Sequence, residues 1–231
     1  MNVFTYTNKG GRDYNQDYIA YTDLGKTASV YVLADGMGGY EYGDEAAQIV
    51  TEAIIQYVRD HFGDTEPFAV LRKAFIRADD RLNERRKEHD EAKMGSVVVA
   101  VIVVDRTAYV AWLGDSRCYQ IRSGKIAFET KDHSLINDLK KVGTYKDSDY
   151  ERFAACVTKS LMGDGQMLIP DMTRLELEEG DLIVLCSDGI HKEMAVDMLP
   201  DADENLKDLL DAISPTLPDN CSIIRITVKS E

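Results

Sequence analysis

Apolar residues recur along this chain at two spacings, which predict where strands and helices lie. Short runs rich in β-branched residues predict buried strands over residues 1–7, 18–21, 30–34, 97–104, 108–113, 118–122, 125–128, 182–186 and 222–228. Apolar positions three and four residues apart predict helices over 44–60, 67–87, 134–142 and around 206–213. Strands and helices therefore come in blocks, which favours an α+β fold with mostly antiparallel sheets over strict strand–helix alternation.

The two longest predicted helices, 44–60 and 67–87, are separated by a short polar segment, which suggests an antiparallel pair. Thr65 is the predicted N-cap of the second helix, and Pro67 suits its first turn. No repeat, linker or low-complexity stretch interrupts the pattern, so residues 1–231 are predicted to form a single domain.

Composition and charge exclude several classes of function. The chain is 44% hydrophobic and 29% charged, as expected of a soluble globular protein. Its net charge of −14 argues against nucleic acid or an anionic membrane as a partner. The longest apolar run, 97–104, is far shorter than the roughly 20 residues that span a bilayer.

The first residues and the cysteines point to the cytoplasm. Residues 1–10 are polar and lack the apolar core of a secretory signal. The cysteines form no CxxC pair and resemble core thiols of a reducing compartment; they are Cys118, Cys156, Cys186 and Cys221. We therefore expect a cytoplasmic protein. We also expect it to act as a monomer.

Aspartates stand repeatedly where a predicted buried strand ends or begins. Asp35, Asp115 and Asp188 follow the strands 30–34, 108–113 and 182–186. Asp17 and Asp219 each precede one. Aspartate is common in turns, so the ordinary interpretation is a set of turn residues. If the side chains converged, they would repel each other unless divalent cations bridged them. Oxygen ligands without histidine or cysteine favour Mg²⁺ or Mn²⁺.

Several short motifs resemble those of a known family in order and spacing. They are Arg12-x-x-Asn15-Gln16-Asp17, Asp35-Gly36-Met37-Gly38-Gly39, Gly114-Asp115-Ser116-Arg117, Val157-Thr158-Lys159-Ser160-Leu161, Gly180-Asp181 with Ser187-Asp188-Gly189, and Asp219-Asn220. This series is similar to that of the PP2C (PPM) protein serine/threonine phosphatases, and the chain resembles a compact bacterial member over almost its whole length.

The resemblance implies a fold and a reaction. The fold is a four-layer αββα sandwich, in which two antiparallel β-sheets are flanked by pairs of antiparallel helices. A flap beside the active site would span about residues 134–160. The implied reaction is hydrolysis of phosphoserine and phosphothreonine in proteins, by a metal-activated water at a binuclear Mn²⁺ or Mg²⁺ centre that takes two or three ions.

The resemblance also implies a role for particular residues. Asp35 would bridge the two ions, and the Gly36 carbonyl would bind one of them. Asp188 and Asp219 would hold the other ion. Asp17 would order water bound to the ions.

Further implied roles concern the phosphate, a third ion and the proton donor. Arg12 would grip the substrate phosphate, because a guanidinium fork matches phosphate oxygens. Asp115, together with Asp188, would form a third metal site, although Lys192 stands where many members place a further acid. His133 and His191 are candidate proton donors for the leaving oxygen. The ordinary interpretation is that each is a surface or structural histidine, which is the more frequent role of an isolated histidine.

The implied reaction predicts a class of partner and leaves two alternatives open. The expected partners are phosphoproteins modified by a eukaryotic-type serine/threonine kinase. The alternatives are a non-catalytic regulatory or binding module of the same fold, or a regulatory phosphatase dedicated to one signalling partner. Arg12 and Asp35 are both present, which favours catalysis. A cysteine phosphatase is unsupported, because no cysteine has an arginine six positions on.

Overall fold

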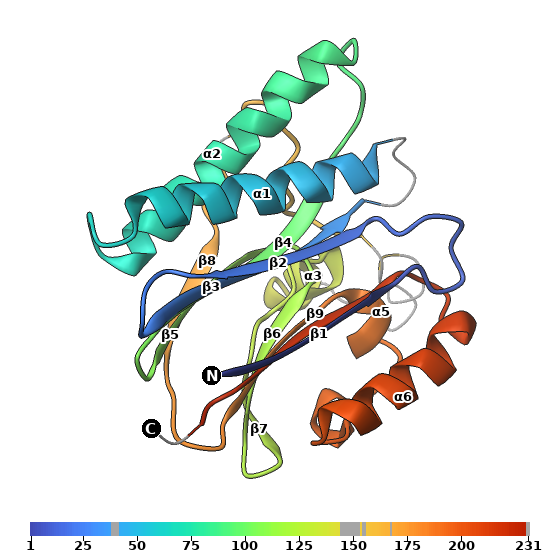
Figure 1. The fold of residues 1–231 in the computed structure, drawn as a ribbon. Coiled ribbons are helices and arrows are strands. Elements are labelled where there is room, and N and C mark those ends of the chain that lie inside the picture. Colours follow the sequence, from blue (N-terminus) through green and yellow to red (C-terminus); the bar gives the residue numbers. More distant parts are fainter. Residues whose placement is uncertain (38–41, 144–152, 154–155, 167, 230–231) are drawn as a thin grey trace.

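Two five-stranded sheets packed face to face form the centre of the molecule, and helices cover their outer faces (Figure 1). The computed structural model of the chain describes residues 1–37, 42–143, 153, 156–166 and 168–229. Every pair of neighbouring strands is antiparallel. The predicted α+β class and the two antiparallel sheets are therefore confirmed.

The strands are assigned to the sheets as follows. The first sheet consists, in spatial order, of β1 (Asn2–Asn8), β10 (Cys221–Thr227), β9 (Leu182–Cys186), β6 (Arg117–Arg122) and β7 (Lys125–Glu129). The second consists of β2 (Asp17–Asp23), β3 (Ala28–Gly36), β4 (Ser96–Val104), β5 (Thr107–Leu113) and β8 (Asp171–Glu176).

Helices form the two outer layers. Two long helices, α1 (Gly43–His61) and α2 (Pro67–Glu88), cover the outer face of the second sheet (Figure 1). The first sheet is covered by α6 (Asp203–Ile213) and the four-residue α5 (Asp188–His191). Short 3₁₀ turns, Val196–Met198 and Ser214–Thr216, flank α6, and α3 (Leu135–Lys141) follows β7. This is the predicted four-layer sandwich.

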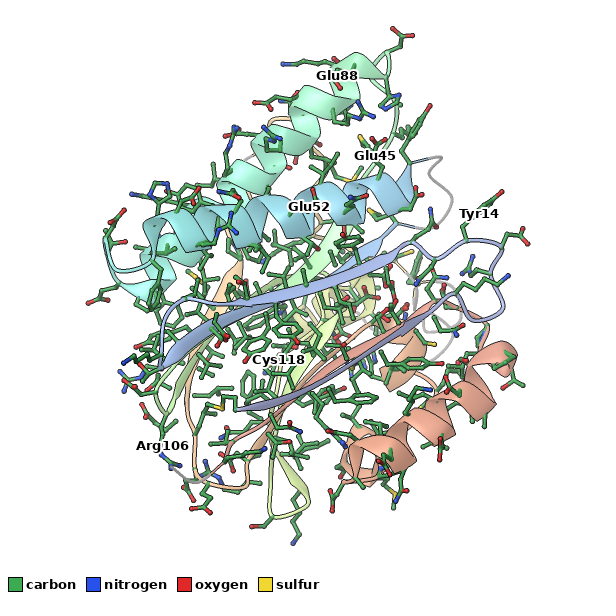
Figure 2. All side chains as sticks on the ribbon, in the orientation of Figure 1. Tyr14, Glu45, Glu52, Glu88, Arg106 and Cys118 are labelled. Atoms are coloured by element: carbon green, nitrogen blue, oxygen red, sulfur yellow. The ribbon has the colours of Figure 1, made fainter. Side chains whose placement is uncertain are left out.

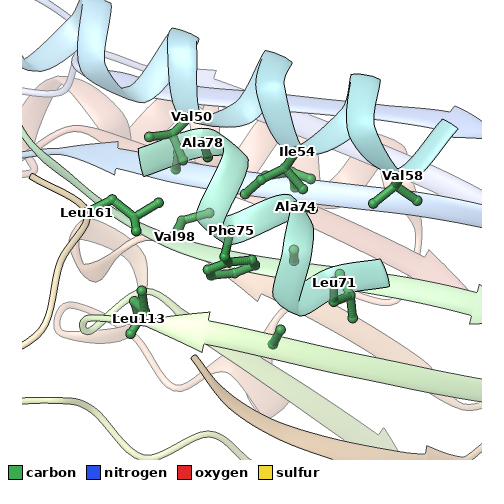
Figure 3. Packing of buried hydrophobic residues seen from close by; sticks show 14 of the residues in the cluster. Val50, Ile54, Val58, Leu71, Ala74, Phe75, Ala78, Val98, Leu113 and Leu161 are labelled. Carbon is green, nitrogen blue, oxygen red and sulfur yellow. The ribbon is translucent and has the colours of Figure 1, made fainter. Parts of the chain in front are cut away.

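Three apolar layers hold the sandwich together. Figure 3 shows the outer layer, where Ile54 of α1 and Phe75 of α2 pack with Val98 of β4. A second layer fills the space between the sheets, and a third lies beneath α6. Strands β3 and β4 are buried on both faces, which explains why their sequences are almost continuously apolar.

Two local predictions differ from the structure. Thr65 does not cap α2: the N-cap is Glu66, which makes no side-chain capping bond, whereas Pro67 occupies the first turn as predicted. Thr65 instead pairs with Phe62 in an isolated bridge. The strand β8 was not predicted, because it is an edge strand whose mostly polar residues are half-exposed. It gains its order from hydrogen bonding to β5.

The predicted flap over 134–160 is described only in part, because 144–152 and 154–155 lie outside the described residues. Ser134 caps α3 by accepting a hydrogen bond from the Asn137 backbone N–H. A bridge between Ser134 and Val157 joins the two described ends of the segment. Its action as a flap stays a prediction. Among the described helices, none has the length and apolar character to cross a membrane.

Candidate metal and phosphate site

The register of β2 and β3 brings the first two acids together. Asp17 is directly opposite Asp35 in the antiparallel ladder, so both carboxylates lie at the same end of the second sheet. The Gly36 N–H donates to the Gln16 carbonyl at 2.9 Å. A Cβ at Gly36 would stand 2.1 Å from the Gly43 carbonyl oxygen, so only glycine allows α1 to start this close to the strand.

Three more acids lie at the same end of the sandwich. Asp188 follows β9 and Asp219 precedes β10; because these strands are antiparallel neighbours, the end of one lies beside the start of the other. Asp115 lies between β5 of one sheet and β6 of the other. Its backbone carbonyl accepts a hydrogen bond from His191 Nε2 at 2.9 Å, which ties it to the Asp188 segment.

The pKa values of these acids show that they interact. Burial raises the pKa of Asp35 well above its usual value, and the charges of Asp17, Asp188, Asp115 and Asp219 raise it further. Burial likewise raises the pKa of Asp17 to about 7, although hydrogen bonds from serines partly oppose the shift. Five acids from distant parts of the chain thus form one electrostatic cluster.

Two cationic side chains neutralise the edges of the cluster. Lys192 Nζ lies 2.6 Å from Asp188 Oδ2 and 3.4 Å from Asp115 Oδ2. Arg12 Nη2 donates to Asp219 Oδ2 at 2.8 Å. The Arg12 side chain is 51% exposed, so its guanidinium is accessible to a phosphate approaching from solvent.

Asn220 and Ser187 are supporting residues to which sequence reasoning gave no role. Asn220 Nδ2 donates to the carbonyls of Lys9 and Tyr14, and its Oδ1 accepts from the Gln16 N–H, each at 2.8 Å. One buried amide therefore holds the loop that carries Arg12. Figure 2 shows Tyr14 projecting from this loop. The sequence motif Asp219-Asn220 already included Asn220, but only the fold shows which groups its side-chain amide contacts.

Ser187 holds Asp17 from the other sheet. Its hydroxyl donates to Asp17 Oδ2 at 2.8 Å and accepts from the Ser222 N–H at 2.9 Å. Within the part of the chain that the structure describes, Asp17 Oδ1 is buried and has no hydrogen-bond partner. A buried carboxylate oxygen without a partner is costly, and the like charges of Asp188 and Asp219 act on this carboxylate.

The residues present fit a hard divalent cation. All the donors are oxygens. The unpartnered Asp17 oxygen and the raised pKa values of Asp17 and Asp35 show that the centre of the cluster is short of positive charge, whereas Lys192 and Arg12 pair with the acids at its edges. Among the described residues, no three histidine, cysteine or acidic side chains are already arranged to hold an ion. Asp188 and Asp219 are instead paired with Lys192 and Arg12.

The two histidines considered as proton donors have other partners. His133 is buried, and its Nδ1 accepts a hydrogen bond from the Gly114 N–H at 3.1 Å. Burial lowers its pKa. His191 donates to Asp115, and burial lowers its pKa to about 4. Both rings are therefore neutral near pH 7 and serve to hold the Asp115 segment.

A sequence profile of the family Protein phosphatase 2C matches residues 9–221. The chain belongs to the protein phosphatase 2C family. It is 32% identical over 183 residues to a putative protein phosphatase 2C-type of Streptococcus pyogenes serotype M6, covering 78% of this chain and 74% of the relative.

Solved structures of phosphatases share the fold. The S. agalactiae serine/threonine phosphatase superimposes with a TM-score of 0.83 and 26% identity, covering 99% of each chain. The catalytic domain of the phosphatase PstP, in complex with two manganese ions, has a TM-score of 0.81 and 24% identity, covering 99% of this chain and 98% of that one. The predicted 2C-type fold and enzyme class, a protein serine/threonine phosphatase, are thereby confirmed.

Proposed function

We propose that this 2C-type phosphatase hydrolyses phosphoserine and phosphothreonine in proteins at a centre of two Mn²⁺ or Mg²⁺ ions held by its acidic cluster. The observation that carries the proposal is the convergence of the five acids with Arg12 at one end of the sandwich. Repelling carboxylates and a nearby guanidinium are what a phosphate site with bound cations requires. The PstP structure with two manganese ions supports the same choice of metal.

The ligand roles follow from where each acid lies in the cluster. Asp35 is partly buried and its charge interacts with the other four acids, which suits a ligand shared by both ions. The Gly36 carbonyl follows it in the chain and is proposed to bind one ion. Asp188 and Asp219 come from the first sheet, on the opposite side of the cluster, and are proposed to hold the other.

Asp17 is proposed to orient the attacking water. Ser187 fixes one carboxylate oxygen, which leaves Oδ1 free to accept a hydrogen bond. When bound, the two cations lower the pKa of water and offset charge on the phosphoryl oxygens. Asp17 would hold the water in line with phosphorus, because orientation of the nucleophile contributes much of the rate.

Arg12 is proposed to bind the phosphate. Its guanidinium lies on Asp219 in this structure, and this half-exposed pair is weak enough to open. A phosphate dianion offers a stronger, bidentate partner for the same fork. Transfer of Arg12 from Asp219 to the phosphate would also release the Asp219 carboxylate for an ion, so that the two binding events support each other.

A covalent cysteinyl intermediate is not part of the proposal. Cys118 and Cys186 are fully buried, and burial raises the pKa of both thiols. Buried neutral thiols are poor nucleophiles. Direct attack by water is therefore the reaction that the site supports.

We propose phosphoproteins modified by a eukaryotic-type serine/threonine kinase as substrates, and the cytoplasm as the location. Cys118, Cys186 and Cys221 are buried free thiols, which supports a reducing compartment. Cys156 is exposed, so the prediction that it is a core thiol was wrong. Action as a monomer stays a prediction, for which the sedimentation coefficient of the purified chain is the measurement.

The proposal is tested with a phosphothreonine peptide and with p-nitrophenyl phosphate, in the presence of Mn²⁺ and of EDTA. We expect turnover of both substrates that disappears with the chelator. Turnover that persists in EDTA would contradict the metal assignment. No turnover in Mn²⁺ by a folded protein would instead favour the non-catalytic module.

A further inference from the structure

Lys192 occupies an unusual position within the acidic cluster. It lies one turn after Asp188 across the short helix α5, so the two side chains share a face. Its ammonium is 2.6 Å from Asp188 Oδ2 and 3.4 Å from Asp115 Oδ2. One cation of the chain thus joins an acid that follows β9 to an acid in the loop between β5 and β6.

Asp115 is held by two consecutive residues of the same segment. His191 Nε2 donates to the Asp115 backbone carbonyl at 2.9 Å, while Lys192 contacts its carboxylate. The Asp115 side chain is only 11% exposed, so its other possible partners are few. The nearby Arg117 is engaged elsewhere, since its guanidinium binds Asp132 through two hydrogen bonds of 2.7 and 2.8 Å.

An ammonium and a divalent ion cannot both occupy the position between Asp115 and Asp188, because the two cations would repel each other. Lysine donates hydrogen bonds and offers no lone pair when charged, so Lys192 cannot itself be a ligand. A divalent ion between Asp115 and Asp188 would have to displace the ammonium. Of the remaining acids, Asp17 and Asp35 have no cationic partner among the described residues, and Asp219 is paired with Arg12, which the proposed phosphate binding would release.

We propose that Lys192 is a built-in cation that binds Asp115 and Asp188 in place of a third divalent ion, so that the cluster takes two ions. This inference rests on the proposed function, because it assumes that the cluster binds metal. Asp115 is then not a metal ligand, in contrast to the third-site role that the resemblance implies. Asp188 keeps one carboxylate oxygen, Oδ1, for an ion while Oδ2 remains on Lys192.

Counting bound ions tests the inference without measuring activity. The wild-type chain, K192E and K207E are dialysed to equilibrium against Mn²⁺, and the bound manganese is measured by atomic emission. K207E is the matched control, because Lys207 forms the same i,i+4 pair with Asp211 on the exposed face of α6. We expect two ions in the wild type and in K207E, and three in K192E, where a carboxylate replaces the ammonium.

The outcomes separate this inference from the proposed function. Three ions in the wild type, or two in K192E, would overturn the inference and leave the metal centre in place. No bound ion in the wild type would overturn the metal centre itself.

A second variant guards against misfolding of K192E. K192M removes the ammonium without adding charge, so we expect the melting temperature in EDTA to fall by about 3 °C or more. Addition of Mn²⁺ should then raise the melting temperature of K192M more than that of the wild type. An equal rise in the two proteins would contradict the proposed role of Lys192.

Discussion

Two buried aspartates differ in how their charge is matched: Asp181 has a full set of structural partners, and Asp17 is the acid proposed to act in catalysis. Asp181, before β9, is 1% exposed, and Asp17, at the start of β2, is 6% exposed. Asp181 accepts hydrogen bonds from the Arg122 guanidinium, the Gln120 amide and the Glu178 N–H. Asp17 has one unpartnered oxygen and lies among like charges.

The pKa values shift in opposite directions. Burial raises the pKa of both groups, but the hydrogen bonds and charge of Arg122 reverse the shift at Asp181 and lower its pKa below the usual value. At Asp17 the serine hydroxyls are too weak to do so, and the pKa stays raised at about 7. Burial alone therefore does not mark a functional acid. A missing partner does, because the fold leaves that charge to be matched by something else.

Asp35→Asn should have the largest effect on activity. Loss of the carboxylate shared by the proposed ions should lower kcat/KM for p-nitrophenyl phosphate about a thousandfold or more. The melting temperature in EDTA should not fall, because the substitution removes a charge that the cluster repels. Steady-state assays in Mn²⁺ and thermal melts in EDTA measure the two effects, and a variant with wild-type turnover would contradict the role of Asp35.

Asp181→Asn should show the reverse pattern. Without its charge, Arg122 loses a buried partner, and we expect a loss of about 2 kcal/mol in the free energy of unfolding. The Arg122 side chain is 35% exposed, so water reduces the loss. Turnover by the folded variant should stay within about twofold of wild type. Urea denaturation gives the stability. A large loss of turnover with unchanged stability would contradict the structural role of Asp181 and would make it resemble Asp35.

The metal-free protein should lose stability as the pH rises. The pKa of Asp17 is about 7 in the folded state and near 3.8 when unfolded, so the folded state binds more protons between these values. Its contribution to stability is fully present below about pH 3.8 and is lost as the pH rises through 7, so stability at pH 8 should be lower than at pH 5 by on the order of 2 kcal/mol. Asp35 shifts the same way. Urea melts in EDTA at both pH values measure this.

The pH effect has a matched control in Asp17→Asn, which should reduce the dependence between pH 5 and pH 8 to the part that comes from Asp35. The pKa of Asp181 is shifted in the opposite direction. Because it is lowered, the contribution of Asp181 to the free energy of unfolding is present at neutral pH and is lost only as the pH falls through the acidic range in which aspartate is protonated. A metal-free protein that becomes more stable toward pH 8 would contradict the electrostatic description of the cluster.

Arg12→Lys should have the smallest effect. The charge remains but the bidentate fork is lost, so kcat/KM for a phosphothreonine peptide should fall about tenfold. The free energy of unfolding should change by less than about 1 kcal/mol, because the Arg12–Asp219 pair is half-exposed. Peptide kinetics and urea denaturation measure both. A stability loss without a kinetic effect would make Arg12 a structural residue.

Much of the fold could be predicted from local pattern. The apolar runs of β3, β4 and β9 are buried on both faces, so burial and sequence agree closely there. Strand β8 escaped prediction because its order depends on pairing with β5. The Thr65 cap was wrong because a capping residue is chosen by the path of the chain into the helix, which the local sequence does not define.

The sequence by itself determined the α+β class, the family motifs and the acids at the strand ends, because these depend on spacing and residue type within short segments. Only the tertiary structure decided that Asp17 lies opposite Asp35, that Ser187 and Asn220 hold the site, and that Lys192 lies between Asp115 and Asp188. Those contacts join segments up to 211 residues apart. Strand register and the packing of the two sheets create them, and neither is encoded in any single stretch of the chain.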